Sequence, residues 1–136
     1  MTHPILDITS IKRFINKIEQ AIFRDETTTI SQMNALMCLL DHGGLTAGNI
    51  AIMLNISKSA VSMLMHTLEN EGMVIRSFDR FDRRLVLYSL TEEGIVVTNR
   101  LRKKRSLIIQ KTLSPLLTPG EISELNSIFS KLIIKK

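Results

Sequence analysis

Residues 46–91 constrain the fold most, because two short helical segments separated by a tight break lead directly into a basic hairpin. Thr46 can cap the first of these helices, and residues 55–56 interrupt it. Ser57 can cap the second, since a serine or threonine oxygen accepts a hydrogen bond from a free N–H of the first helical turn. Gly72 favours a stop, because glycine adopts the left-handed conformation without steric cost. The predicted order is helix, turn, helix.

Two segments with the composition of strands follow. Residues 73–78 and 85–90 are rich in β-branched and apolar side chains, which favours a hairpin. Residues 79–84, DRFDRR, lie between them and include three arginines in six positions. Such a loop could be merely solvated, but three guanidinium groups on a projecting hairpin favour contact with phosphates and the minor groove of DNA. A helix-turn-helix followed by a basic hairpin is the arrangement of a winged helix.

The second helix of the pair has two different faces. The spacing of one buried stripe is found at Val61, Leu64, Met65 and Leu68. The other side carries mostly small, polar or weakly basic residues, namely Lys58, Ser59, Ser62, Met63 and His66. An ordinary amphipathic surface helix would show the same pattern, but this outer face also fits the major groove. The basic hairpin favours the DNA-binding interpretation.

The stretch from residue 45 to residue 94 resembles the MarR/SlyA family of bacterial transcription regulators. The matching residues are Leu45, Thr46, Ile50, Ala51, Ser57, Val61, Ser62, Leu68, Glu69, Glu71, Gly72, Met73, Val74, Arg76, Asp82, Arg83, Arg84, Leu90, Thr91 and Gly94. The most specific part is Asp82-x-Arg84, followed by a strand and then Leu-Thr-Glu-Glu-Gly. The resemblance implies a mainly α fold with a small β-hairpin wing, in which a winged helix-turn-helix domain is flanked by N- and C-terminal dimerisation helices.

The residues and the resemblance together predict a DNA-binding surface. We expect Ser57, Lys58, Ser59, Ser62 and His66 to meet the major groove and its flanking phosphates. Arg84 matches the family's arginine that enters the minor groove, and Asp82 matches the acidic partner that holds it by a charge-assisted hydrogen bond. Arg80 and Arg83 are expected at phosphates, which give affinity and register. Because the outer face of the helix lacks Arg, Asn and Gln, base recognition is expected to be modest or to depend on DNA shape.

Apolar seams lie on both sides of the winged helix. One is formed by Ile8, Ile11, Ile15, Ile18 and Ile22, and the other by Leu125, Ile128, Phe129, Leu132 and Ile133. The resemblance implies that such helices interlock in a homodimer, and twofold symmetry then predicts a pseudo-palindromic site on double-stranded DNA. We expect a single domain over residues 1–136, with the winged helix-turn-helix at about 31–91 and dimerisation helices at about 7–23 and 91–134.

The remaining helices have recognisable ends. Ser31 is expected to cap the helix after the first connection, and Thr118 with Glu121 to form a capping box for the last helix. The long helix from Thr91 to about Leu113 carries five cations, at Arg100, Arg102, Lys103, Lys104 and Arg105. Because they surround the helix, we expect them to be solvated, with contact to the DNA backbone as the alternative.

Composition limits the other classes of function. The net charge of +5 favours a polyanionic partner. No apolar run approaches the ~20 residues that cross a membrane, and no signal peptide is evident, so a cytoplasmic location is expected. Cys38 lacks a cationic neighbour and is predicted to be a buried structural thiol. His3, His42 and His66 make a poor ligand set, so neither a metal nor another cofactor is expected.

The predicted function is therefore a dimeric, sequence-specific DNA-binding regulator, most often a repressor in the family that it resembles. The resemblance also implies a small aromatic or phenolic ligand that binds between the dimer helices and the winged helix, although no diagnostic ligand set is visible. The alternative is a winged-helix dimer that serves as a protein-interaction module. An enzyme is disfavoured, because the sequence has no glycine-rich phosphate loop and no nucleophile elbow. Ser57 and His66 also lie too far apart along one helix to act together.

Overall fold

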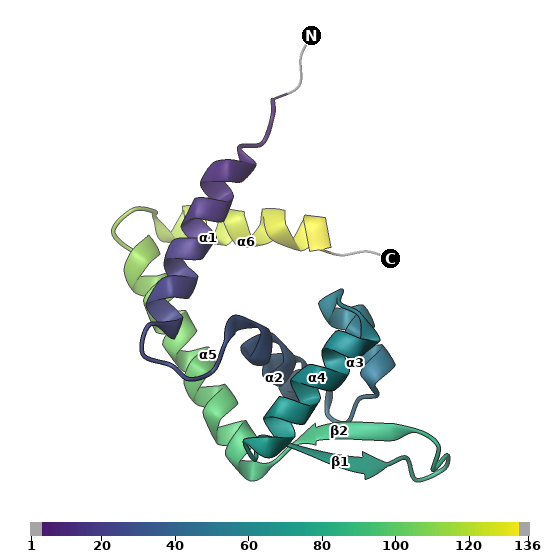
Figure 1. Ribbon diagram of the computed structural model, residues 1–136. Helices are drawn as coiled ribbons and strands as arrows, with labels where there is room; N and C mark the ends of the chain where they lie inside the picture. The colour runs from purple at the N-terminus through teal and green to yellow at the C-terminus, as the bar shows by residue number, and fades with distance from the viewer. Residues whose placement is uncertain (1–3, 134–136) are drawn as a thin grey trace.

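The computed structural model describes residues 4–133, which form six α-helices and a two-stranded sheet (Figure 1). In chain order the elements are α1 (Ile8–Phe23), α2 (Ile30–His42), α3 (Ala47–Leu54), α4 (Lys58–Asn70), β1 (Val74–Phe78), β2 (Val86–Leu90), α5 (Glu92–Leu113) and α6 (Pro119–Ile133). The predicted fold class, mainly α with a small antiparallel wing, is confirmed. His3 and residue 134 lie outside the described residues.

The winged helix is built around one apolar core that α2, α3, α4 and the hairpin share. Its fully buried side chains include Ala35, Leu36, Ile50, Val61, Met65 and Leu68. Leu45 and Tyr88 exchange backbone hydrogen bonds of 3.0 and 2.8 Å, so the segment between α2 and α3 joins the sheet beside β2. The base of the wing is thereby fixed to the core, while its tip projects away from it (Figure 1).

Left-handed backbone makes the two predicted breaks. Asn55 ends α3 with φ of 56°, which asparagine tolerates better than most residues. Gly72 follows α4 with φ of 78° and turns the chain into β1. The strands pair in register from Val74 opposite Leu90 to Phe78 opposite Val86. The loop at the tip therefore spans residues 79–85, one residue more than predicted.

Four predicted helix starts are confirmed. Thr46, Ser57 and Thr91 each accept a hydrogen bond from the backbone N–H three residues further on, at 3.0 to 3.1 Å. Thr118 and Glu121 form the reciprocal capping box before α6.

The prediction that Ser31 caps α2 is wrong. The N–H of Gln32 donates to the hydroxyl of Thr29 at 3.2 Å, and the side-chain oxygen of Gln32 accepts from the N–H of Thr29 at 2.9 Å. This reciprocal pair satisfies two free donors together, so the cap is Thr29, two residues before the predicted one, and the helix begins at Ile30.

A second apolar cluster joins α1, α2 and α5. Ile18 and Ile22 from α1 pack with Met33, Met37 and Leu101. Only this half of the α1 isoleucine seam is buried, and α6 contains no buried residue within Pro119–Ile133. Figure 1 shows α6 running on from the far end of α5, away from the wing. No helix within residues 4–133 combines the length and the apolar character needed to cross a membrane.

Cys38 lies in the core of the winged helix, 8% exposed, which confirms the prediction of a buried thiol. Burial raises the pKa of the Cys38 thiol, and the nearby carboxylate of Asp41 raises it further. Its sulfur lies 3.4 Å from the sulfur of Met53. A thiol with a raised pKa forms little of the reactive thiolate at neutral pH, as a structural cysteine should.

The cations of α5 are paired more than predicted. Glu26, in the connection between α1 and α2, accepts hydrogen bonds from Arg100 at 2.8 and 2.9 Å and from Lys104 at 2.8 Å. Arg102 donates to Asp41 at the end of α2, at 2.6 Å. The prediction of a uniformly solvated set is therefore wrong for three of its five members. These ion pairs tie the long helix to the two segments that precede the helix-turn-helix.

Glu26→Gln is expected to lower the free energy of unfolding by about 2 kcal/mol at pH 7. Arg100 and Lys104 lower the pKa of the Glu26 carboxyl from 4.5 to about 2. Since the folded pKa is depressed, the stabilisation is complete above pH 4.5 and disappears as the pH falls towards 2. Urea unfolding at pH 7 and pH 3 tests this, with Asp25→Asn in the same connection as the matched control. A Gln variant as stable as wild type at pH 7 would contradict the role of the ion pairs.

Candidate nucleic-acid interface

The outer face of α4 carries the side chains that were predicted to meet the major groove. Ser59, Ser62 and His66 are all exposed and lie at positions that share one side of the helix. The exposed Met63 lies between them and is 74% accessible. Apart from this methionine, the face offers hydroxyl and imidazole groups, which can both donate and accept hydrogen bonds.

Ser57 and Lys58 lie at the N-terminal end of the same helix. The Ser57 hydroxyl accepts from the N–H of Ala60 and lies 3.2 Å from the Ser59 hydroxyl. Ser57 therefore caps the helix, and it also lies on the exposed surface. At the other end, His66 Nε2 lies 3.3 Å from the side-chain nitrogen of Asn70, which orients the imidazole ring.

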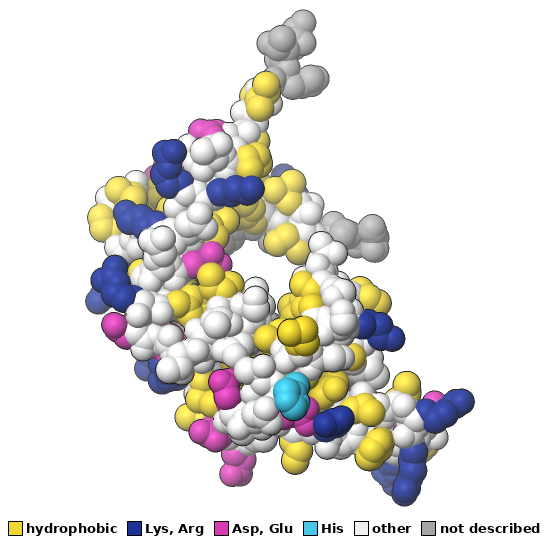
Figure 2. Space-filling model, viewed as in Figure 1, with side chains coloured by type: hydrophobic (Ala, Val, Ile, Leu, Met, Phe, Trp, Pro, Cys, Tyr) yellow, Lys and Arg dark blue, Asp and Glu magenta, His cyan; other side chains and the backbone are white. Residues whose placement is uncertain are grey.

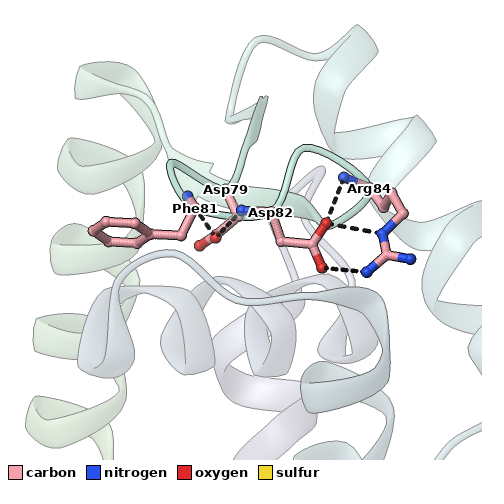
Figure 3. Close-up of polar contacts among 4 residues, drawn as sticks. All are labelled: Asp79, Phe81, Asp82 and Arg84. Atoms are coloured by element: carbon pink, nitrogen blue, oxygen red, sulfur yellow. Dashed lines mark hydrogen bonds and ion pairs between the residues drawn. The ribbon is translucent and has the colours of Figure 1, made fainter.

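The tip of the wing is organised by an ion pair between Asp82 and Arg84 (Figure 3). Asp82 Oδ1 accepts from Arg84 Nε at 3.0 Å and from the backbone N–H of Arg84 at 3.1 Å, while Oδ2 accepts from Nη2 at 3.3 Å. These hydrogen bonds hold the pKa of the Asp82 carboxyl below its usual range. The arginine side chain is 91% exposed. The guanidinium group is therefore directed by its partner and yet open to solvent on its remaining N–H groups.

Asp79 is a second organising carboxylate that the sequence analysis missed. Its Oδ2 accepts hydrogen bonds from the backbone N–H groups of Phe81 at 3.0 Å and Asp82 at 2.8 Å (Figure 3). An aspartate at the end of a strand that bonds the backbone two and three residues further on forms an Asx turn. The pattern Asp79-x-Phe81-Asp82 carried this information in the sequence. The turn fixes the loop that presents the arginine.

The arginines gather at the free end of the wing, where Figure 2 shows a group of cationic side chains away from the body of the molecule. Arg80 and Arg83 are both exposed there. The guanidinium carbon of Arg80 lies 5.9 Å from the centre of the Phe81 ring, a cation–π contact. No role for the phenylalanine was predicted from the sequence.

A shallow groove connects the helix-turn-helix to the wing. Lys58 from α4 and Arg84 from the wing both line it, together with Thr46 at the start of α3 and Tyr88 of β2. At the base of the wing, Arg76 of β1 also pairs with Glu69 of α4 at 3.2 Å. The wing is thus braced against the helix whose outer face it flanks. The predicted DNA contacts on α4 and those on the wing therefore lie next to each other, with the groove between them.

Within residues 4–133, no group of three or more His, Cys, Asp or Glu side chains is arranged to hold a metal ion. Near the end of α2, His42 Nδ1–H donates to the carbonyl oxygen of Cys38 at 3.0 Å. His66 lies on the outer face of α4.

A helix-turn-helix with a polar outer face and an adjoining wing that ends in arginines defines the class of winged helix-turn-helix DNA-binding proteins. The MarR family model matches residues 28–86. The repressor MdtR of Bacillus subtilis is 29% identical over 126 residues, which cover 90% of this chain and 81% of that protein. The chain belongs to the MarR family of winged-helix transcriptional regulators. It is a DNA-binding transcriptional regulator.

Solved structures agree with this assignment. The YusO protein from Bacillus subtilis, whose crystal structure is known, is 28% identical in sequence to this chain. The match covers 92% of this chain and 90% of YusO, and the two structures superpose with a TM-score of 0.71. BpsR of Bordetella bronchiseptica, whose DNA binding is regulated by 6-hydroxynicotinic acid, is 22% identical. It covers 100% of this chain and 99% of its own, with a TM-score of 0.77, and at that identity the likeness concerns the fold alone.

Proposed function

We propose that the protein is a homodimeric repressor that binds a pseudo-palindromic DNA site through two winged helices. The observation that carries the proposal is the Asp82–Arg84 pair, which presents an exposed guanidinium group at the end of a braced hairpin. A guanidinium group of this kind suits the minor groove, where arginine is attracted by the negative potential. The similarity to the repressor MdtR supports the direction of regulation.

In this proposal α4 lies in the major groove. Ser59, Ser62 and His66 reach base edges, while Ser57 and Lys58 meet the flanking phosphates at the start of the helix. The groove shared by Lys58 and Arg84 supports simultaneous contact of the helix and the wing with one duplex. Arg80 and Arg83 then bind phosphates on either side of the inserted loop.

Dimerisation would cover the apolar seams that one chain leaves exposed. On α1, Ile8 is 51% and Ile15 is 47% exposed. On α6, Ile128, Phe129, Leu132 and Ile133 are 44% to 75% exposed. Two amphipathic helices that expose this much apolar surface favour an interface between copies, because monomers rarely leave contiguous patches of this kind open.

A small aromatic acid is the proposed inducer. A cavity of about 240 Å³ opens between α1, α2 and α5, where a dimer helix meets the winged helix. Its walls are mostly apolar and include Phe14, Ile18, Ile22, Phe23, Met33 and Ile109. Arg105 and Glu19 are the charged groups that line it. A flat ring fits such walls, and Arg105 offers a carboxylate a charge-assisted hydrogen bond.

Arg105→Ala is expected to weaken the binding of an aromatic carboxylate by about tenfold, because a hydrogen bond to a charged group contributes roughly 1.5–3 kcal/mol. The measurement is calorimetric titration with 6-hydroxynicotinic acid and with benzoate. Lys103→Ala is the matched control, since Lys103 is an exposed cation on the same helix that does not line the cavity. Binding that is equally strong in wild type and Arg105→Ala would remove the arginine from the site. If wild type binds neither compound, the aromatic-acid proposal is wrong.

The function itself is tested by measuring the affinity for duplex DNA at several salt concentrations. A dimer that contacts six or more phosphates is expected to lose about a thousandfold in affinity between 50 and 200 mM salt. The alternative is a winged-helix dimer that acts as a protein-interaction module. That alternative predicts weak binding without a steep salt dependence, and such a result would replace the proposed function.

A further inference from the structure

We propose that Phe81 is a second contact of the wing with the minor groove, in which its ring packs against deoxyribose on the side of the loop opposite Arg84. This inference rests on the proposed function, because it requires that the wing binds DNA. It adds an apolar contact to a surface that has so far been described only by its charges.

The exposure of Phe81 is the first observation. The side chain is 91% exposed, although the removal of a phenylalanine ring from water is favourable. It lies at the projecting tip of the hairpin, away from the core that fixes the base of the wing. The ring therefore contributes no packing to the fold and is free to contact a binding partner.

The second observation is that the backbone that carries the ring is held in place before binding. The Phe81 N–H donates to Asp79 Oδ2 at 3.0 Å, and the same oxygen accepts from the N–H of Asp82 at 2.8 Å. Asp82 in turn holds Arg84. One chain of hydrogen bonds thus fixes the backbone from which the ring projects and the side chain of Arg84. Figure 3 shows the phenyl ring and the guanidinium group pointing to opposite sides of the loop.

This arrangement matches the shape of the minor groove. The groove is about 6 Å wide, so a loop inserted into it has a sugar-phosphate wall on each side. The faces of the deoxyribose rings in these walls are apolar. When Arg84 reaches towards one side, the opposite side of the loop meets the other wall, where a phenyl ring finds an apolar surface.

The surrounding charges identify the partner as nucleic acid. The Arg80 guanidinium group lies over the ring, 5.9 Å from its centre, and Arg83 is exposed in the same loop. When the Phe81 ring enters the groove, the Arg80 guanidinium group stacked on it would lie close enough to contact an adjacent phosphate. Apolar side chains that enter the minor groove beside basic residues are a known way of binding DNA.

The test is Phe81→Ala, with the affinity for a selected duplex measured at several salt concentrations. We expect affinity to fall about tenfold at every salt concentration, with an unchanged salt slope, because the ring carries no charge. Phe81→Leu should recover most of the loss. Arg83→Ala is the matched control in the same loop, and it should reduce the slope by about two units, one for each wing of the dimer. Hydroxyl-radical footprinting should show that sugar protection at the wing disappears on one strand in Phe81→Ala.

The outcomes separate this inference from the function on which it rests. Steep, salt-dependent binding by wild type with no loss in Phe81→Ala would overturn the inference and leave the proposed function intact. A loss of affinity that is accompanied by a smaller salt slope would also overturn it, because the ring would then act only through Arg80. Wild-type protein that binds no duplex would overturn both. The loss of affinity, unchanged slope and lost sugar protection together would establish the contact.

Discussion

Replacing Arg84 with alanine is expected to weaken binding to the selected duplex by about 30- to 100-fold. The variant removes the guanidinium group from the minor groove, where hydrogen bonds to charged groups contribute roughly 1.5–3 kcal/mol. It also leaves the carboxylate of Asp82 without the partner that it now binds at 3.0 Å, close to the negative DNA. The measurement is fluorescence anisotropy with wild type and variant at one salt concentration, followed by a salt titration. The salt slope should decrease by about two units, because the dimer loses one cationic contact at each of its two wings.

Three further variants show whether the geometry of the pair matters. Arg84→Lys keeps the charge but cannot form the forked contact with Asp82, so it should recover only part of the affinity. Asp82→Asn keeps the size of the side chain and removes the charge that orients the arginine, so it should also bind more weakly. Arg24→Ala removes an exposed arginine that follows α1 and should have little effect. Equal affinity of Arg84→Ala and wild type would remove the wing from the mechanism.

Gly94→Ala is expected to destabilise the fold by about 3 kcal/mol. A Cβ at residue 94 would overlap the carbonyl oxygen of Met73 and would lie 3.3 Å from a methyl group of Leu90. The obstacle is mostly backbone, because the same carbonyl accepts the N–H of Thr91 at 3.0 Å where α5 begins. The start of α5 and the entrance to β1 would have to separate, and the base of the wing would lose its position. Urea unfolding at a fixed protein concentration measures the loss.

Gly120→Ala is the matched control for this prediction. The nearest atom to an added Cβ there is the Thr118 hydroxyl oxygen at 3.8 Å, an ordinary contact. Because alanine is favoured over glycine within a helix by roughly 0.5–1 kcal/mol, this variant of α6 should be as stable as wild type or slightly more stable. If Gly94→Ala instead unfolds at the same urea concentration as wild type, the close approach of α5 to β1 is not a constraint on the fold.

Local patterns in the sequence predicted most of the fold, because the responsible interactions lie within a few residues. The caps at Thr46, Ser57 and Thr91 bond the N–H three residues further on, so each is visible in a short window of sequence. The one misplaced start, at Ser31, has the same local origin. Gln32 returns the hydrogen bond to Thr29, and a threonine followed by glutamine three residues later was the stronger pattern.

Interactions between distant residues could not be predicted in this way. Glu26 pairs with Arg100 and Lys104, which are 74 and 78 residues further along the chain. Nothing in the composition of α5 distinguishes these cations from the solvated Lys103. These partners meet only because α1, α2 and α5 pack together around Leu101 in the folded protein.

The candidate site divides in the same manner. The Asp82–Arg84 pair spans two residues, and the resemblance to the family predicted it correctly. The support given by Asp79 is equally local and could have been recognised from the Asx pattern. The groove shared by Lys58 and Arg84 depends instead on the packing of β2 against α3 and of α3 against α4, which the sequence does not specify directly.

The most direct test of the account is the selection of binding sites from a pool of random duplexes with the wild-type protein. Two winged helices related by a twofold axis predict that a pseudo-palindrome is enriched, with half-sites about one helical turn apart. Arg84→Ala should fail to enrich the same site under the same conditions. Enrichment of no sequence, or of a single site without twofold symmetry, would contradict the proposal of a dimeric reader.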